Sequence, residues 1–321
     1  MNDLTPETVA LLRDIQGLGL PPLHECTPAE ARELRKSAAA LGKVEVEEVA
    51  DVLDLTIDGP DRPLPVRLYT PARPADASQT THVGILVYFH GGGWVLGSLD
   101  THDALCRGLA NSSGLEVVAV DYRLAPENPH PAALDDAWTA TEWAAARARS
   151  SGGSLVVGGD SAGGHLATCV SARARQSGPE IAAQVLVYPV TDLSSFETAS
   201  YGRYAEGYWL TTAAMEWFRN HYLSAGTDRM HPDVSPLYRS DLRGMPPAIL
   251  VAAGCDVLLD EGARYAERLI EDGGEVTVLS YPGVIHGFMA LPAAIPEGRQ
   301  AINDVGTLLR LRLGRRLDGG P

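Results

Sequence analysis

Gly159-Asp160-Ser161-Ala162-Gly163 is the most informative segment of the chain and matches the pattern G-x-S-x-G. It lies between a short apolar run at residues 154–157, which we expect to be a strand, and helical periodicity at residues 164–176. In this context the serine occupies a tight strand-to-helix turn, and small neighbours let the helix approach the strand closely. The segment therefore predicts an α/β fold that presents Ser161. A plain glycine-rich turn or an anion-binding helix start is the alternative.

The flanking sequence repeats the same alternation of strands and helices. Helical stretches at residues 132–149 and 261–271 separate apolar runs of strand length at residues 84–89, 115–121, 183–188, 248–253 and 275–281. Such alternation favours a mostly parallel sheet with helices on both faces. Extended runs at residues 44–57 and 65–69, joined by Asp58-Gly59-Pro60-Asp61, predict an antiparallel hairpin. We therefore expect a sheet of about eight strands.

Two regions lie outside this alternation. Residues 1–43 lack strand patterning and contain two helix starts, of which Thr27-Pro28-Ala29-Glu30 is a capping box. About sixty residues separate the strands that end near 188 and begin at 248, several times a usual connection, and this interval is rich in aromatic residues. We expect residues 1–43 to form a helical N-terminal segment and residues 44–321 the α/β domain, with an insertion at about 192–240 that forms a lid or cap over a cleft.

Composition excludes several classes of function. With 26 Lys and Arg against 41 Asp and Glu, the formal net charge is −15, which argues against nucleic acid as a partner. No apolar run approaches the ~20 residues of a membrane helix, and the first twelve residues do not resemble a secretory signal. The cysteines and histidines lack metal-ligand spacing. We therefore expect a cytoplasmic protein with no stable membrane insertion, no metal and buried free thiols.

A glycine-rich segment, His90-Gly91-Gly92-Gly93-Trp94, directly follows the expected strand at residues 84–89. Acyl transfer needs backbone N–H groups aimed at the developing oxyanion, and glycines let a carbonyl group approach such donors. The segment is of the H-G-G-G oxyanion-loop type, with a flexible turn as the alternative. We expect the donors to be the amides of Gly92, Gly93 and Ala162.

A serine nucleophile needs a histidine base and an orienting carboxylate. Asp256 follows the strand at residues 248–253, and His286 follows the strand at residues 275–281. The carboxyl ends of parallel strands meet at one edge of a sheet, so these side chains should converge on Ser161. We expect activity to fall in acid with an apparent pKa of ~6–7, because neutral His286 must act as the base.

Two other residues compete for these roles. Asp260 is a second acid in the same loop, but its place near the first turn of the next helix suits a cap or dipole partner. His165 follows Ser161 by four residues, yet it belongs to the packed helix whereas the serine projects from the turn. Asp256 and His286 are therefore the better candidates.

Together these motifs are similar to the hormone-sensitive-lipase-like branch of the α/β-hydrolases, the bacterial family IV esterases. Further ordered matches extend the resemblance over most of the chain, at residues 121–127, 188–189, 235–237, 246–248 and 281–283. The resemblance implies an α/β-hydrolase fold with a helical cap built partly from the N-terminal segment, residues 1–43. It also implies a cofactor-free carboxylesterase for small-molecule esters with short to medium acyl chains. It also suggests a homodimer, with the strand at residues 275–281 as an edge. Val257 and His130 depart from the usual motifs and bear on substrate range.

Five aromatic residues are candidates for the walls of a substrate pocket, with ordinary core packing as the alternative. They are Trp94, Tyr208, Trp209, Trp217 and Phe288. A peptidase or amidase would use the same triad and stays open. A non-catalytic receptor on this scaffold would lack the histidine, and a dehalogenase or epoxide hydrolase would carry aspartate at position 161.

Overall fold

The computed structural model describes residues 3–41, 46–72 and 84–317. The described residues form one eight-stranded, mostly parallel sheet, as the sequence predicts, and its strand order is β1-β2-β4-β3-β5-β6-β7-β8. Its members are β1 (Asp51–Ile57), β2 (Leu64–Thr70), β3 (Gly84–Phe89), β4 (Glu116–Val120), β5 (Ser154–Asp160), β6 (Ala183–Val187), β7 (Ala248–Cys255) and β8 (Val276–Ile285). β3 to β8 pair in parallel, and β1 and β2 form the antiparallel edge.

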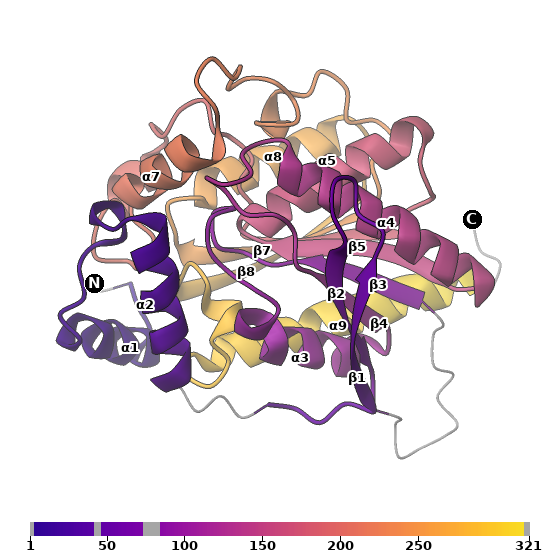
Figure 1. Ribbon diagram of the computed structural model, residues 1–321, viewed down its shortest axis with the longest axis horizontal. Helices are drawn as coiled ribbons and strands as arrows, with labels where there is room; N and C mark the ends of the chain where they lie inside the picture. Colours follow the sequence, from indigo (N-terminus) through magenta and orange to yellow (C-terminus); the bar gives the residue numbers. More distant parts are fainter. Residues whose placement is uncertain (1–2, 42–45, 73–83, 318–321) are drawn as a thin grey trace.

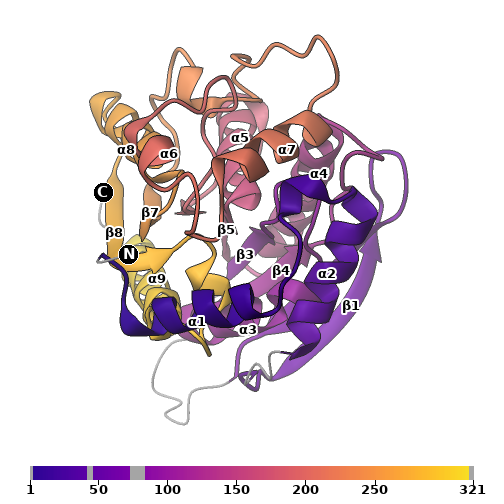
Figure 2. The ribbon, with the colours of Figure 1, turned by 90° about the vertical axis from the view of Figure 1, so that its left-hand side faces the viewer.

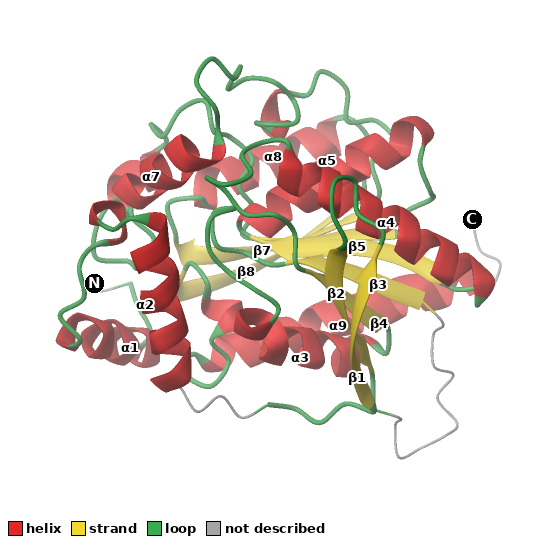
Figure 3. Cartoon of the chain, viewed as in Figure 1, coloured by secondary structure: helices red, strands yellow, loops and turns green. Residues whose placement is uncertain are grey.

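Helices cover both faces of this sheet (Figures 1 and 3). On one face lie α4 (Ala132–Ser150), α5 (Ala162–Ser177) and α8 (Leu259–Glu271), and on the other lie α3 (Asp103–Ser113) and α9 (Pro296–Leu317). The central strands β3 and β6 are buried along their whole length, which explains why their sequences are apolar apart from Gln184. The sheet therefore carries the core, and its carboxyl edge is free to hold a site.

The first strand is shorter than the sequence predicts. The run at residues 44–57 contains β1, which begins at Asp51, whereas residues 42–45 lie outside the described residues. Asp51 pairs with Thr70, the last residue of β2, so the partner strand ends there. The described residues 46–50 are not part of a strand, and the last of them, Ala50, still donates its amide to Thr70 O at 2.9 Å.

The N-terminal residues form α1 (Pro6–Gly17), a short turn at Leu23–Glu25 and α2 (Pro28–Leu41). The capping box is present: the Thr27 amide donates to Glu30 at 2.8 Å, and the Glu30 amide donates to Thr27 Oγ1 at 3.3 Å. Between β6 and β7 the chain forms α6 (Ala199–Arg203) and α7 (Thr212–Tyr222). Figure 2 shows α1, α2 and α7 on the same side of the molecule. None of the described helices is long and apolar enough to cross a bilayer.

Candidate active site

Ser161 lies in a sharp turn between β5 and α5. Its backbone has φ 56° and ψ −117°, a left-handed conformation that costs energy for a residue with a Cβ. Two hydrogen bonds hold the turn: the Ser161 amide donates to Val187 O at 2.8 Å, and the His165 amide donates to Ser161 O at 3.0 Å. This geometry lifts the hydroxyl away from the helix toward the carboxyl edge of the sheet.

His286 and Asp256 lie at the ends of the two adjacent strands. His286 Nδ1 is 2.7 Å from Asp256 Oδ2, and His286 Nε2 is 2.9 Å from Ser161 Oγ. All three side chains are buried, although Ser161 and His286 keep 7% of their surface accessible. With the Nδ1 proton donated to the carboxylate, Nε2 is free to accept the serine proton. The structure thus brings the three predicted residues into one hydrogen-bonded chain.

The competing acid in the same loop faces elsewhere. Asp260 Oδ2 accepts the Ser200 amide at 2.8 Å and has no contact with His286. Its neighbour Glu261 is fully buried and accepts the amides of Thr191 and Asp192 at 2.6 and 3.1 Å. Burial raises the pKa of Glu261 to about 8. Asp256 is therefore the acid that contacts the imidazole.

His165, the other competitor, packs in the core. Its ring meets Trp94 edge-on at 5.2 Å between ring centroids, and it is fully buried. Burial lowers the pKa of His165 to about 3. The residue is a neutral packing group and takes no part in the chain from Ser161 to Asp256.

The glycine-rich loop after β3 lies beside Ser161. Gly92 and Gly93 have φ 118° and 59°, and a Cβ on Gly93 would overlap the ring of Phe218. Among the described residues, no group accepts a hydrogen bond from the amides of Gly92, Gly93 or Ala162. Three free donors in one place can therefore receive a developing negative charge.

His90 packs against the glycine-rich loop. Its ring stacks on Tyr122 with 4.2 Å between centroids, and its Nδ1 is 2.8 Å from Gly91 O. Burial lowers the pKa of His90 to about 4. His90 therefore acts as a neutral packing group under the loop and contributes no positive charge.

Asp160 is a residue that the sequence reasoning missed. Its buried carboxylate accepts hydrogen bonds from the Gly91 amide and the Tyr88 hydroxyl, both at 3.0 Å, and lies 3.3 Å from His102 Nε2. Burial alone would raise the pKa of Asp160, but His102 and the hydrogen bonds outweigh it and lower the pKa. Asp160 directly precedes Ser161, so its carboxylate holds the glycine-rich loop close to the serine. An acidic residue inside an otherwise small-residue turn is the signal that could have revealed it.

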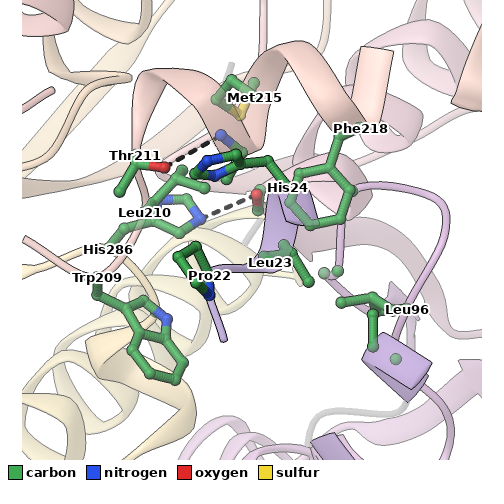
Figure 4. Close-up of a pocket in the computed structure, with 18 of the residues that line it drawn as sticks. Pro22, Leu23, His24, Leu96, Trp209, Leu210, Thr211, Met215, Phe218 and His286 are labelled. Atoms are coloured by element: carbon green, nitrogen blue, oxygen red, sulfur yellow. Dashed lines mark hydrogen bonds between the residues drawn. The ribbon is translucent and has the colours of Figure 1, made fainter. Parts of the chain in front are cut away.

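A cavity of about 420 Å³ opens above Ser161 and His286. One wall comes from the N-terminal segment and another from Trp209 to Phe218, and Figure 4 shows side chains of both walls around His286. No lysine or arginine of the described residues lines it. Its apolar lining includes Leu12, Ile15, Leu20, Pro22, Leu23, Leu34, Leu210 and Met215. Sequence reasoning did not identify these N-terminal lining residues, because aliphatic residues on short helices and the segment between them look like ordinary core.

The structure places two of the five predicted aromatic residues, Trp94 and Trp209, on this cavity. The other three are not among its lining residues. Tyr208 packs against Tyr204, Trp217 donates its indole N–H to Cys26 O at 3.1 Å, and Phe288 is buried beside Tyr188 and Tyr281. These contacts fit the alternative of ordinary packing.

Other groups that could serve chemistry are accounted for. All four cysteines fall among the described residues, and each is buried and free. In the described part of the chain, no three His, Cys, Asp or Glu side chains are grouped so that they could hold a metal ion.

Comparisons with known proteins agree with this geometry. A family model described as alpha/beta hydrolase fold matches residues 86–290. The carboxylic ester hydrolase LipN of Mycobacterium tuberculosis is 40% identical over 83% of this chain and 71% of its own length. An ethyl acetate hydrolase of Pseudomonas putida is 40% identical over 88% of this chain and 89% of its own. An ester hydrolase from the metagenome of Lake Arreo, solved with a bipyridine phosphonate derivative, is 39% identical with a TM-score of 0.90, covering 97% and 99% of the two chains.

Proposed function

The chain belongs to the alpha/beta-hydrolase family, in its hormone-sensitive-lipase-like branch of carboxylic ester hydrolases, and we propose that it cleaves short- to medium-chain esters through an acyl-enzyme on Ser161. The observation that carries the proposal is the hydrogen-bonded chain from Ser161 through His286 to Asp256 beside three free amides.

In the proposed mechanism, Ser161 Oγ attacks the ester carbonyl carbon while His286 Nε2 takes its proton. Asp256 stabilises the imidazolium, and the amides of Gly92, Gly93 and Ala162 bind the oxyanion of the tetrahedral intermediate. The intermediate collapses and His286 gives its proton to the leaving alkoxide. Water, deprotonated by His286, then attacks the carbonyl carbon of the acyl-enzyme, and the second tetrahedral intermediate breaks its bond to Ser161 Oγ. His286 returns its proton to Ser161 Oγ as the acid leaves.

The cavity supports a neutral, largely apolar substrate. Its lining has no lysine or arginine among the described residues to pair with an anionic substrate. The relative named for ethyl acetate shows that a similar chain acts on a small ester. We therefore place short and medium acyl esters first, with an amide as the second candidate because the same triad serves both.

The proposal also covers the cap, the cellular compartment and the oligomeric state of the enzyme. Residues 1–43 and the insertion at about 192–240 act as the cap, the protein works in the cytoplasm, and it pairs as a homodimer. Free buried thiols support the cytoplasm, where disulfides are rare. β8 lies at the edge of the sheet, which supports pairing there.

The test is labelling with the organophosphate paraoxon combined with a panel of p-nitrophenyl esters and anilides. We expect one phosphoryl adduct on Ser161, rapid ester turnover, and a loss of about 10⁴- to 10⁶-fold in kcat for Ser161→Ala. Ser171→Ala, a buried serine on the same helix, should keep wild-type turnover and serves as the control. Near-normal ester turnover by Ser161→Ala would refute the proposal, and faster turnover of anilides would reassign the substrate.

A further inference from the structure

One arginine of the N-terminal cap reaches across the molecule to the loops at the carboxyl edge of the sheet. Arg32, on α2, donates from Nε to Val95 O at 2.9 Å and from one terminal nitrogen to Ala125 O at 2.7 Å. Both terminal nitrogens also bind the carboxylate of Glu127 at 2.7 Å. A single guanidinium thus connects α2 to the loop after β3 and to the loop after β4.

The two carbonyl groups depend on this arginine. Val95 and Ala125 are fully buried, and within the described residues Arg32 is the only group that donates to their carbonyl oxygens. A buried carbonyl group without a hydrogen bond costs free energy. The two loops are therefore most stable in the conformation in which both carbonyl oxygens accept hydrogen bonds from Arg32. Glu127 is different: it is 58% exposed, and its hydrogen bonds from Arg32 lower its pKa.

Val95 belongs to the turn that contains the proposed oxyanion donors. The amides of Val95 and Leu96 both donate to Gly92 O, at 3.2 and 2.8 Å, which closes the turn around Gly93. The Ala125 amide donates to Trp94 O at 2.9 Å and joins the two loops. Holding Val95 O and Ala125 O therefore restrains the turn on both sides of Gly93.

We infer that Arg32 is a positioning residue for ester hydrolysis: by binding Val95 O and Ala125 O it holds the Gly92 and Gly93 amides in place, and it does so only while α2 is docked. The inference rests on the proposed function. It ties the oxyanion loop to the same N-terminal segment whose residues form one wall of the cavity. Docking of the N-terminal segment then completes the cavity and also positions the Gly92 and Gly93 amides.

The experiment measures kcat and KM for p-nitrophenyl acetate, inhibition by a trifluoromethyl ketone, and the melting temperature of each variant. Acetate is chosen because its acyl group is too short to need the N-terminal wall. For Arg32→Met we expect kcat to fall about tenfold to a hundredfold, the cost of a small misplacement, with KM within about threefold. The inhibition constant of the ketone, whose adduct carries an oxyanion, should rise by a similar factor.

Two control variants separate positioning from cap docking. Glu127→Gln keeps both carbonyl contacts of Arg32, and Arg203→Met removes the exposed ion pair between Arg203 and Asp3 near the start of α1. Both should stay within about threefold of wild type in kcat. The kcat of Arg32→Lys should fall between those of wild type and Arg32→Met, since one ammonium group cannot make all the hydrogen bonds of the planar guanidinium. Arg32→Lys replaces Arg32→Met if that variant fails to fold.

Several results would overturn the inference. They are a change confined to KM or melting temperature, a loss in Glu127→Gln or Arg203→Met equal to that in Arg32→Met, or wild-type kcat in Arg32→Lys. Failure of the proposed function looks different, because wild-type protein would then be inactive toward esters before any change at Arg32.

Discussion

At the scale of single residues, the surroundings of each acidic side chain after β7 decide its role. Asp256, Asp260 and Glu261 lie within six positions of one another, yet one contacts His286, one accepts the amide of Ser200, and one is buried on backbone amides. Their side-chain chemistry is nearly the same, so only their partners distinguish them. Two substitutions in this loop should therefore have very different effects.

Asp256→Asn is expected to lower kcat about 10⁴-fold, because the amide cannot hold the imidazole in the required tautomer or stabilise its charge. Asp260→Asn keeps an oxygen that accepts the Ser200 amide and should stay within about threefold of wild type. Steady-state kinetics on p-nitrophenyl acetate measure both. Equal losses in the two variants would contradict the assignment of Asp256.

Glu261 should make stability depend on pH. Its pKa is raised by burial from 4.5 to about 8, so between these values the folded chain keeps a proton that the unfolded chain releases. The free energy of unfolding therefore falls as pH rises from about 4.5 to about 8 and is level on either side. Glu261→Gln keeps an acceptor for the Thr191 and Asp192 amides and removes this dependence.

Urea unfolding at pH 5 and pH 8 tests this expectation. Glu261→Gln should gain stability relative to wild type as pH rises, whereas the exposed Glu197→Gln should follow the wild-type curve. A difference between Glu261→Gln and wild type that is the same at both pH values would show that Glu261 does not titrate in this window.

At the scale of elements, the close approach of helix and strand backbones fixes the position of the site. α5 packs so near β3 that a Cβ on Gly163 would overlap Phe89 O, the carbonyl directly before the glycine-rich loop. Asp160 then ties that loop to the end of β5 through the Gly91 amide. Ser161 and the oxyanion donors are thus held at a distance set by helix and strand backbones.

Gly163→Ala should lower the free energy of unfolding by about 3 kcal/mol or more and reduce kcat, because α5 has to move away from β3. Gly202→Ala, on α6, meets nothing within 4 Å and should leave stability unchanged or raise it by up to about 1 kcal/mol. Denaturant unfolding and ester kinetics compare the pair. A stable, fully active Gly163→Ala would disprove the packing argument.

At the scale of the whole molecule, the cavity is built by segments far apart in the chain. Residues from Leu12 to Leu34 face residues from Trp209 to Phe218 across the catalytic groups. Two of the contacts that hold the N-terminal segment in place lie near the site. The Thr5 amide donates to Gly283 O at 2.9 Å near the histidine loop, and Arg32 binds Val95 O near the oxyanion loop. We therefore expect the docking of the N-terminal segment to limit the size of the substrate.

A series of p-nitrophenyl esters from acetate to palmitate measures that limit. A cavity of about 420 Å³ with apolar walls should give kcat/KM values that rise with the first added methylenes and then fall at least about tenfold by palmitate. The rise comes from apolar burial and the fall from lack of space. Highest activity on long-chain emulsions would contradict the proposed substrate range.

The sequence by itself determined the fold class, the strand count and the identity of the three residues that meet at the site. This was possible because G-x-S-x-G, the glycine-rich loop and the acid and histidine loops each follow a strand, and parallel strands end at one edge. Local periodicity and turn chemistry are properties of neighbouring residues, so they can be read along the chain.

Only the tertiary structure decided what depends on contacts between distant residues. It showed that Asp160 holds the glycine-rich loop, that Arg32 reaches Val95, and that one wall of the cavity is N-terminal and largely aliphatic. Tyr208, Trp217 and Phe288 are not among the lining residues. The sequence separations involved, such as 63 residues between Arg32 and Val95, leave no periodic signal. Side chains take these roles from the docking of whole elements, which no local pattern encodes.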